Sequence, residues 1–198
     1  MINTSRLLIR QFQEQDYISL FEYLSNPSVY HFEPGKPVSL EEAKELTFER
    51  AQSTDFWAVI LKSTQKMVGH LYFKQTEPQE FLTWELGYIF NPVFHNKGYA
   101  TEAARALIHY GFSHLGIHRI IAHCDPENAA SWKVLEKIGM RREGHFRKNV
   151  FFRRAMDNSP LWIDSFEYAI LIEDMLSSEM SNYTLASMGK LVSNGTQP

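Results

Sequence analysis

Residues 95–103, with the sequence HNKGYATEA, constrain the fold of this chain more than any other segment. They place a loop containing Gly98 directly before a stretch with helical periodicity. The backbone N–H groups of a first helical turn lack partners within the helix, and the helix dipole adds positive potential, so this position suits a phosphate. Gly98 and the small Ala100 leave room for a ligand beside the backbone. Such a segment is more commonly an ordinary strand-to-helix turn with one glycine. The surrounding sequence therefore has to distinguish an anion-binding loop from an ordinary turn.

Composition narrows the class of protein. The 198 residues suit one domain, and 44% of them are hydrophobic, which is enough for a sizeable core. The net charge is -3 and the basic residues are dispersed, so neither nucleic acid nor an anionic membrane is an expected partner. No segment approaches membrane-spanning length, and we expect a cytoplasmic protein.

The cysteine and histidine patterns indicate neither a disulfide nor a metal site. Cys124 is the single cysteine, which fits a reducing compartment, and it ends an apolar run that favours burial over a role as nucleophile. The eight histidines include no HExxH pattern and have no paired cysteines beside them, so no metal is predicted.

The first half of the chain predicts two helices and an antiparallel meander. Residues 6–12 are typical of a strand and residues 16–25 of a helix, with Tyr17, Leu20, Phe21 and Leu24 on one stripe. Ser39 and Glu42 form a capping box for a second helix that reaches about Ala51. The meander comprises residues 56–61, 67–74 and 81–90.

The second half predicts a crossover unit and a closing pair of strands. A helix over residues 101–115 precedes a strand over 119–124, which should lie parallel to the strand before the helix. A helix over 129–138 ends before Gly139, strands follow over 140–152 and 166–172, and residues 153–165 between them look irregular. We expect one domain over residues 1–176 and a polar tail over 177–198.

Three sequence blocks occur in a fixed order around this crossover unit. They are WELGY at 84–88, the loop at 95–103, and NAAS at 128–131 with EKIGM at 136–140. Together they resemble the GNAT superfamily of acyl-CoA-dependent N-acyltransferases, specifically its RimJ/RimL-like branch of ribosomal-protein N-terminal acetyltransferases. The resemblance covers residues 4–175 and implies a single α/β (α+β) domain. Its mixed, mostly antiparallel sheet would have about seven strands, splayed at the centre, with about four helices.

The resemblance implies a binding site for acetyl-CoA. The backbone amides of residues 95–100 would hold the pyrophosphate, and the backbone of residues 88–90 would pair with the pantetheine arm like an added strand. His95 stands where the family usually has Gln or Arg, a difference of little weight if the loop binds through its backbone. The implied cofactor-binding residues are Tyr88, Ile89, Phe90, His95, Asn96, Lys97, Gly98, Tyr99, Ala100, Asn128 and Ser131.

Ser131 and Glu85 are the candidate catalytic residues. By resemblance Ser131 points at the CoA sulfur, and the tyrosine that the superfamily often has four residues later is Leu135 here. Asn128 would reach the CoA arm, although a helix cap is an equally good interpretation. Glu85 is the candidate base because strand alternation puts it on one face with Gly87 and Ile89; a cross-strand pair is the competing interpretation. A backbone N–H near Ile89 is the expected oxyanion donor.

The acceptor is expected to be a primary amine. About a tenth of an α-amine of pKa about 7.7–8.0 is neutral at pH 7, whereas only about one lysine side chain in 2,500 is. An enzyme with a weak catalytic base is therefore better suited to an α-amine, which favours the N-terminus of a ribosomal or other protein or peptide as acceptor. The first two helices with residues 31–38 and 153–165 would form its pocket. A small-molecule amine acceptor, a non-catalytic acyl-CoA-binding module and a homodimer stay open. A dinucleotide-binding oxidoreductase is disfavoured because the loop lacks GxGxxG.

Overall fold

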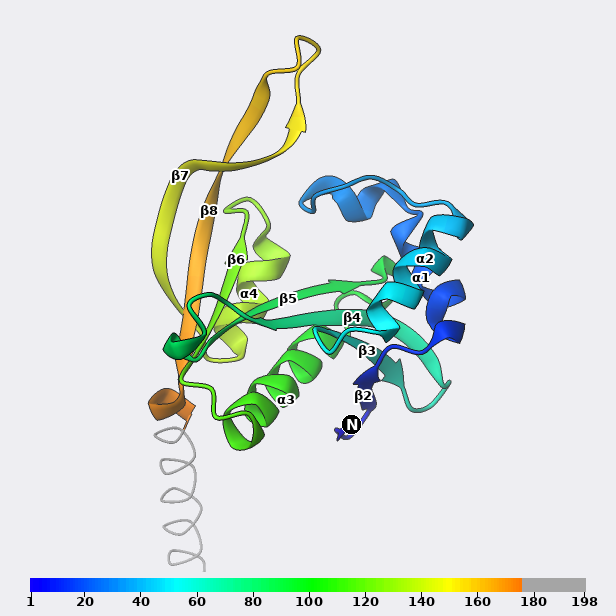
Figure 1. The fold of residues 1–198 in the computed structure, drawn as a ribbon, viewed down its shortest axis with the longest axis vertical. Coiled ribbons are helices and arrows are strands. Elements are labelled where there is room, and N and C mark those ends of the chain that lie inside the picture. Colours follow the sequence, from blue (N-terminus) through cyan, green and yellow to red (C-terminus); the bar gives the residue numbers. More distant parts are fainter. Residues whose placement is uncertain (176–198) are drawn as a thin grey trace, which may run out of the picture.

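The computed structural model describes residues 1–175, which form one eight-stranded sheet with the order β1-β2-β3-β4-β5-β6-β8-β7 (Figure 1). The strands are β1 (Ile2–Asn3), β2 (Leu7–Gln11), β3 (Phe56–Leu61), β4 (Lys66–Gln75), β5 (Thr83–Phe90), β6 (Arg119–Cys124), β7 (Arg141–Arg154) and β8 (Pro160–Leu171). The helices are α1 (Tyr17–Leu24), α2 (Leu40–Ala51), α3 (Tyr99–His114) and α4 (Ala129–Lys137). The expected mixed fold is confirmed, and the predicted tail at 177–198 lies outside the described residues.

Helices cover both faces of the sheet. The core on one face contains buried residues of α3 and α4, such as Leu107 and Leu135, and the core on the other face contains Leu20 and Tyr23 of α1. β3 is buried along almost its whole length, because a strand covered on both sides needs apolar residues at successive positions. None of the described helices is both long and apolar enough to cross a membrane.

Two details of the helix predictions were wrong. On α1 the buried stripe is Leu20, Tyr23 and Leu24, whereas Tyr17 and Phe21 are only partly buried. The helix predicted over residues 101–115 was expected to turn 104, 107, 108, 111 and 115 to one side; the first four are buried on α3, but Leu115 lies just past the helix and is 39% exposed.

The sheet opens between β5 and β6, which are parallel as predicted. They pair only where Thr83, Trp84 and Glu85 face residues 119–121, near the start of both strands. Beyond that point the two strands separate, and α4 begins shortly after the carboxyl end of β6. The opening therefore lies at the carboxyl ends of two parallel strands, where open α/β sheets commonly bind ligands.

Residues 153–165 are not irregular, contrary to the prediction. β7 and β8 form a long hairpin that projects beyond the helices (Figure 1). The turn between Ala155 and Ser159 is closed by the Ala155 N–H, which donates to the Ser159 carbonyl at 2.9 Å. The polar turn residues Asp157 and Asn158 made the whole segment look like a loop, although residues 160–165 pair with β7.

Candidate active site

The loop before α3 has the backbone conformation of an anion-binding turn. Gly98 has φ +78° and caps α3, while Asn96 has φ +60°, so two residues close together adopt the left-handed conformation. Within residues 1–175, the N–H groups of Asn96, Lys97 and Gly98 donate to no acceptor. Together with the free N–H groups of the first turn of α3, they form a cluster of donors suited to a phosphate.

His95 is an exception among the predicted loop donors. Its N–H donates to the Pro92 carbonyl at 3.1 Å, so this amide is already engaged. Its ring Nε2 lies 2.9 Å from the Phe90 carbonyl oxygen, which fits a tautomer protonated at Nε2. His95 therefore holds the end of β5 against the loop.

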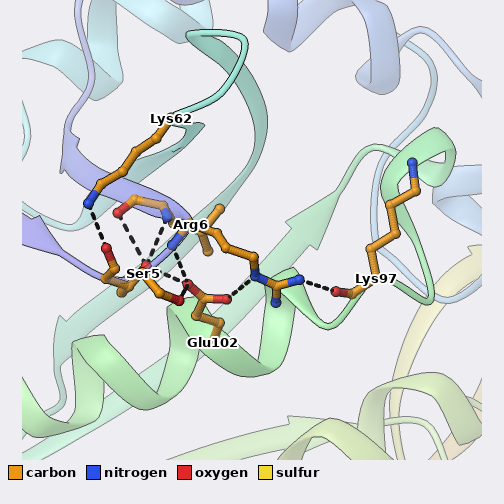
Figure 2. Close-up of polar contacts among 7 residues, drawn as sticks. Ser5, Arg6, Lys62, Lys97 and Glu102 are labelled. Carbon is orange, nitrogen blue, oxygen red and sulfur yellow. Dashed lines mark hydrogen bonds and ion pairs between the residues drawn. The ribbon is translucent and has the colours of Figure 1, made fainter.

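A cluster of polar residues from the N-terminus anchors this loop (Figure 2). Glu102, in the first turn of α3, accepts hydrogen bonds from Thr4 Oγ1 at 2.6 Å and from Arg6 Nε at 2.6 Å. The same Arg6 guanidinium donates from Nη1 to the Lys97 carbonyl at 2.9 Å. Partial burial raises the pKa of Glu102, but the hydrogen bonds from Thr4 and Arg6 outweigh it and lower the pKa overall. The residue pattern gave no indication of this anchor.

The open edge of β5 is formed by its even-numbered residues. The Asn91 N–H donates to the Val68 carbonyl, and the Thr76 N–H donates to the Thr83 carbonyl, so odd-numbered residues of β5 face β4. By this alternation the N–H and C=O groups of Tyr88 and Phe90 point toward the opening, whereas those of Ile89 point toward β4. An added strand or an oxyanion would thus meet Tyr88 and Phe90 rather than Ile89.

Ser131 is paired with Tyr88 at the wall of the opening. Tyr88 Oη donates to the Ser131 carbonyl at 3.0 Å and lies 3.0 Å from Ser131 Oγ. Asn128 Oδ1 accepts from the Ser131 N–H at 3.1 Å, so Asn128 is a helix cap. Burial raises the pKa of the Tyr88 hydroxyl well above its ordinary value, and Tyr88 therefore stays neutral. The sequence indicated only the backbone of Tyr88, yet its side chain is the nearest hydroxyl to Ser131.

Glu85 makes the cross-strand pair that was its competing interpretation. Its Oε1 lies 3.1 Å from His123 Nδ1, and His123 Nε2 lies 3.1 Å from Glu167 Oε2. Hydrogen bonding to Glu85, opposed by burial, raises the pKa of His123. The predicted alternation of β5 is confirmed, since Leu86 and Phe90 pack with the α3 core and Ile89 with the α1 core.

A cleft of about 240 Å³ lies beside Ser131. It is bounded by the segment before α2, the end of β6, the start of α4 and the β7–β8 hairpin. Arg153 on the hairpin donates to the carbonyls of Tyr30 and His31 at 2.7 and 3.0 Å, which connects the first and last of these boundaries. The lining residues are Phe32, Glu33, His123, Cys124, Asp125, Asn128, Ser131, Asn149, Val150, Phe152, Ile163, Asp164 and Ser165.

Cys124 lies in this lining but is not poised for attack. It is 8% exposed, and burial raises the pKa of its thiol to about 11. A protonated thiol is a poor nucleophile, so the expectation of a mainly structural cysteine agrees with its surroundings.

Residues 6–141 match the acetyltransferase (GNAT) domain family. The chain belongs to the GNAT family. The match spans both the anchored loop and the opening between β5 and β6. GNAT enzymes take the acetyl group from acetyl-CoA, and the chain is accordingly an acetyl-CoA-dependent N-acetyltransferase. The unpaired loop amides fit a pyrophosphate, and no group of side chains in residues 1–175 is arranged to hold a metal ion.

Several GNAT proteins are similar to the chain over most of its length. An uncharacterized N-acetyltransferase of Bacillus subtilis, YnaD, is 40% identical over 174 residues, which cover 87% of this chain and 98% of YnaD. The crystal structure of a GNAT-family acetyltransferase from Bacillus anthracis is also 40% identical, with a TM-score of 0.78, and the match covers 87% of this chain and 98% of that one. A more distant relative, the ribosomal protein uS5-alanine N-acetyltransferase of Escherichia coli, is 24% identical over 73% of this chain and 79% of its own.

Proposed function

We propose that the chain acetylates the N-terminal α-amine of a protein or peptide. The observation that carries this proposal is the charge of the cleft beside Ser131. Glu33, Asp125 and Asp164 line it, and none of its described lining residues is a lysine or an arginine. Such a lining attracts an amine in its ammonium form.

The position of the cleft supports a chain terminus as the acceptor. The cleft adjoins Ser131 and is bordered by the projecting hairpin, which offers an extended surface to residues that follow a terminal amine. The Escherichia coli relative is named as an N-acetyltransferase that acts on an alanine of ribosomal protein uS5, which supports a protein as the acceptor.

In this reaction each group of residues would have a separate role. The amides of Asn96, Lys97, Gly98 and the first turn of α3 would hold the pyrophosphate. Tyr88 and Phe90 would pair with the pantetheine arm and supply a backbone N–H to the developing oxyanion. Ser131 would donate a hydrogen bond toward the sulfur, and a thiol of pKa about 8.5 needs little more help to leave.

An acceptor panel tests the proposal. The wild-type protein is incubated with acetyl-CoA and peptides that have a free N-terminus, the same peptides with a blocked N-terminus and an internal lysine, ribosomal proteins, and small amines including polyamines. Thiol release gives the rate, and mass spectrometry locates the acetyl group. We expect transfer to free N-termini only.

The other results of this panel identify the competing functions. Turnover of small amines alone would replace the proposal with a small-molecule acetyltransferase. Acetyl-CoA binding without turnover of any acceptor would indicate a non-catalytic acyl-CoA-binding module.

A further inference from the structure

Glu33 differs from the other carboxylates of the cleft in having no partner among the described residues. Asp125 Oδ1 accepts from the Glu127 N–H at 2.7 Å, and Asp164 accepts from His145 Nε2 at 2.7 Å and from the Lys148 N–H at 2.9 Å. Within residues 1–175, Glu33 has neither a hydrogen bond nor an ion pair. A partly buried carboxylate without donors is costly unless a ligand supplies them.

The surroundings of Glu33 come from four parts of the fold. Phe32 lies beside it on its own segment, and His123, Asp125 and Asp164 line the same cleft from β6, the turn after β6, and β8. Glu33 also lies close enough to Tyr88 that its charge contributes to the raised pKa of the Tyr88 hydroxyl. Arg153, next to the lining residue Phe152, donates to the Tyr30 and His31 carbonyls.

We propose that the Glu33 carboxylate binds the ammonium group of the acceptor and takes its first proton. This inference rests on the proposed acetyl transfer to an amine and names the residue that receives it. Burial raises the pKa of Glu33 to about 7, which is close to that of an α-amine and far from that of a lysine. Proton transfer from an α-ammonium to Glu33 is therefore nearly balanced, whereas transfer from a lysine is strongly uphill.

The step balances without another reactant. One proton passes from the ammonium nitrogen to Glu33, and the freed lone pair forms the C–N bond to the thioester carbonyl carbon as the C–S bond breaks. The nitrogen loses a second proton when the amide forms, and the departing thiolate takes up one proton. Glu33 then releases its proton to solvent.

Two other groups near the opening are less suited to this role. Both ring nitrogens of His123 are engaged with carboxylates, so the ring has no free lone pair for the amine. Glu85 is paired with His123 and is not among the residues that line the cleft. Because Glu85 is the competing candidate base, the test below also includes a variant of Glu85.

The test compares Glu33→Gln, Glu33→Asp, Glu85→Gln and the control Glu45→Gln, an exposed carboxylate on α2 outside the cleft. For an acceptor that the wild type acetylates, Glu33→Gln should lower kcat/KM about 100-fold or more near pH 7, with Glu33→Asp partly restoring it. The affinity for acetyl-CoA should change less than about twofold, because Glu33 faces the acceptor. Glu45→Gln should stay within about threefold of wild type, and Glu85→Gln should lose less activity than Glu33→Gln.

The pH profile separates a base from a merely structural residue. The wild type needs an ionised Glu33 and a protonated amine, so kcat/KM should be bell-shaped between about pH 7 and pH 8. Glu33→Gln has no base at this position and must use the amine that is already neutral. Its kcat/KM should therefore rise with pH up to the pKa of the amine and then stay level, without a maximum. A bell-shaped profile in Glu33→Gln, or a larger loss in Glu85→Gln than in Glu33→Gln, would overturn the proposal.

The outcome is independent of whether the acceptor is a peptide. If only small amines are acetylated, the proposed function fails, and Glu33 is judged on those amines with the same variants. If no acceptor is found, the ionisation of Glu33 is followed by carboxyl carbon NMR on glutamate-labelled protein with CoA bound. A titration in the ordinary range of glutamate would then overturn the role of Glu33, and a raised value that falls when an alkylammonium ion is added would support it.

Discussion

The guanidinium of Arg6 joins the loop before α3 to the first turn of that helix, because its Nε lies 2.6 Å from Glu102 Oε2 while its Nη1 lies 2.9 Å from the Lys97 carbonyl. Glu102 belongs to the first turn of α3, and Lys97 directly precedes the left-handed Gly98. One side chain from the N-terminal segment therefore fixes the loop relative to the helix that it caps. Such preorganisation reduces the entropy that the loop must lose when it binds an anion.

The first prediction concerns this anchor. Arg6→Gln should raise the Kd for CoA about three- to tenfold, because a charge-assisted hydrogen bond is lost and the loop samples other conformations. Isothermal titration calorimetry measures the affinity. Lys66→Gln removes an exposed ion pair with Glu22 of α1, which covers the other face of the sheet from α3; this variant is the matched control and should bind CoA normally. Equal affinities of the two variants would show that the anchor does not order the loop.

The second prediction concerns Gly98, whose φ of +78° is unfavourable for residues with a Cβ. Gly98→Val should weaken CoA binding more than about tenfold, because a β-branched residue displaces the backbone from this conformation. Gly98→Asn is the control, since asparagine tolerates the left-handed region better than other residues. A Cβ at this position would lie 3.4 Å from Arg6 Nη2, which is close but not prohibitive. Similar losses in both variants would point to crowding instead of backbone strain.

The third prediction concerns the two hydroxyls of Tyr88 and Ser131. Tyr88→Phe and Ser131→Ala should each lower kcat about three- to thirtyfold with little change in acetyl-CoA affinity. The Ser131 hydroxyl would donate toward the departing sulfur, the Tyr88 hydroxyl would position Ser131, and neither would contact the bound phosphates. Since Tyr88 Oη contacts Ser131 Oγ, the double variant should be less impaired than the product of the two single effects. Kinetics of all three variants measure this coupling, and strictly multiplicative losses would mean that the hydroxyls act separately.

Features set by local sequence could be predicted here. The junction of loop and helix near Gly98, the alternation along β5 and the capping box at Ser39 each depend on residues within one turn or one strand. The parallel pairing of β5 with β6 followed from the handedness of a crossover connection. These elements lie in the region that also carries the family resemblance.

Features set by distant contacts could not be predicted. Arg6 and Glu102 are 96 positions apart, and each alone is typical of a solvated surface. Glu33 lies in a segment rich in proline and glycine that suggests an exposed loop, and its burial depends on the β7–β8 hairpin. The predicted acceptor pocket did bring residues 31–38 and 153–165 together, and Phe32, Glu33 and residues 163–165 line one cleft. Because residues 153–165 looked irregular, the sequence did not indicate that they border this cleft as part of a hairpin.

The last prediction concerns a buried histidine on the opposite side of the sheet from Ser131. His70 is 3% exposed, and its Nδ1 lies 2.6 Å from Tyr23 Oη. Burial, together with the charge of Arg50, lowers the pKa of His70 well below its ordinary value of 6.5. Below about pH 6.5 the unfolded chain therefore binds a proton that the folded chain does not, and the free energy of unfolding should fall as the pH falls. The slope from this one group approaches about 1.4 kcal/mol per pH unit.

Urea denaturation of the wild type and His70→Gln between pH 7.5 and pH 5 measures this contribution. His123 has a raised pKa, so its protonation stabilises the fold below its ordinary pKa and opposes the effect of His70. The background from His123 is the same in both proteins, and their difference isolates His70. In His70→Gln the slope of the unfolding free energy against pH should be smaller by the contribution of about one proton. The control His118→Gln changes an exposed histidine and should leave the wild-type slope unchanged. Parallel curves for wild type and His70→Gln would mean that the protein protonates His70 without loss of its fold.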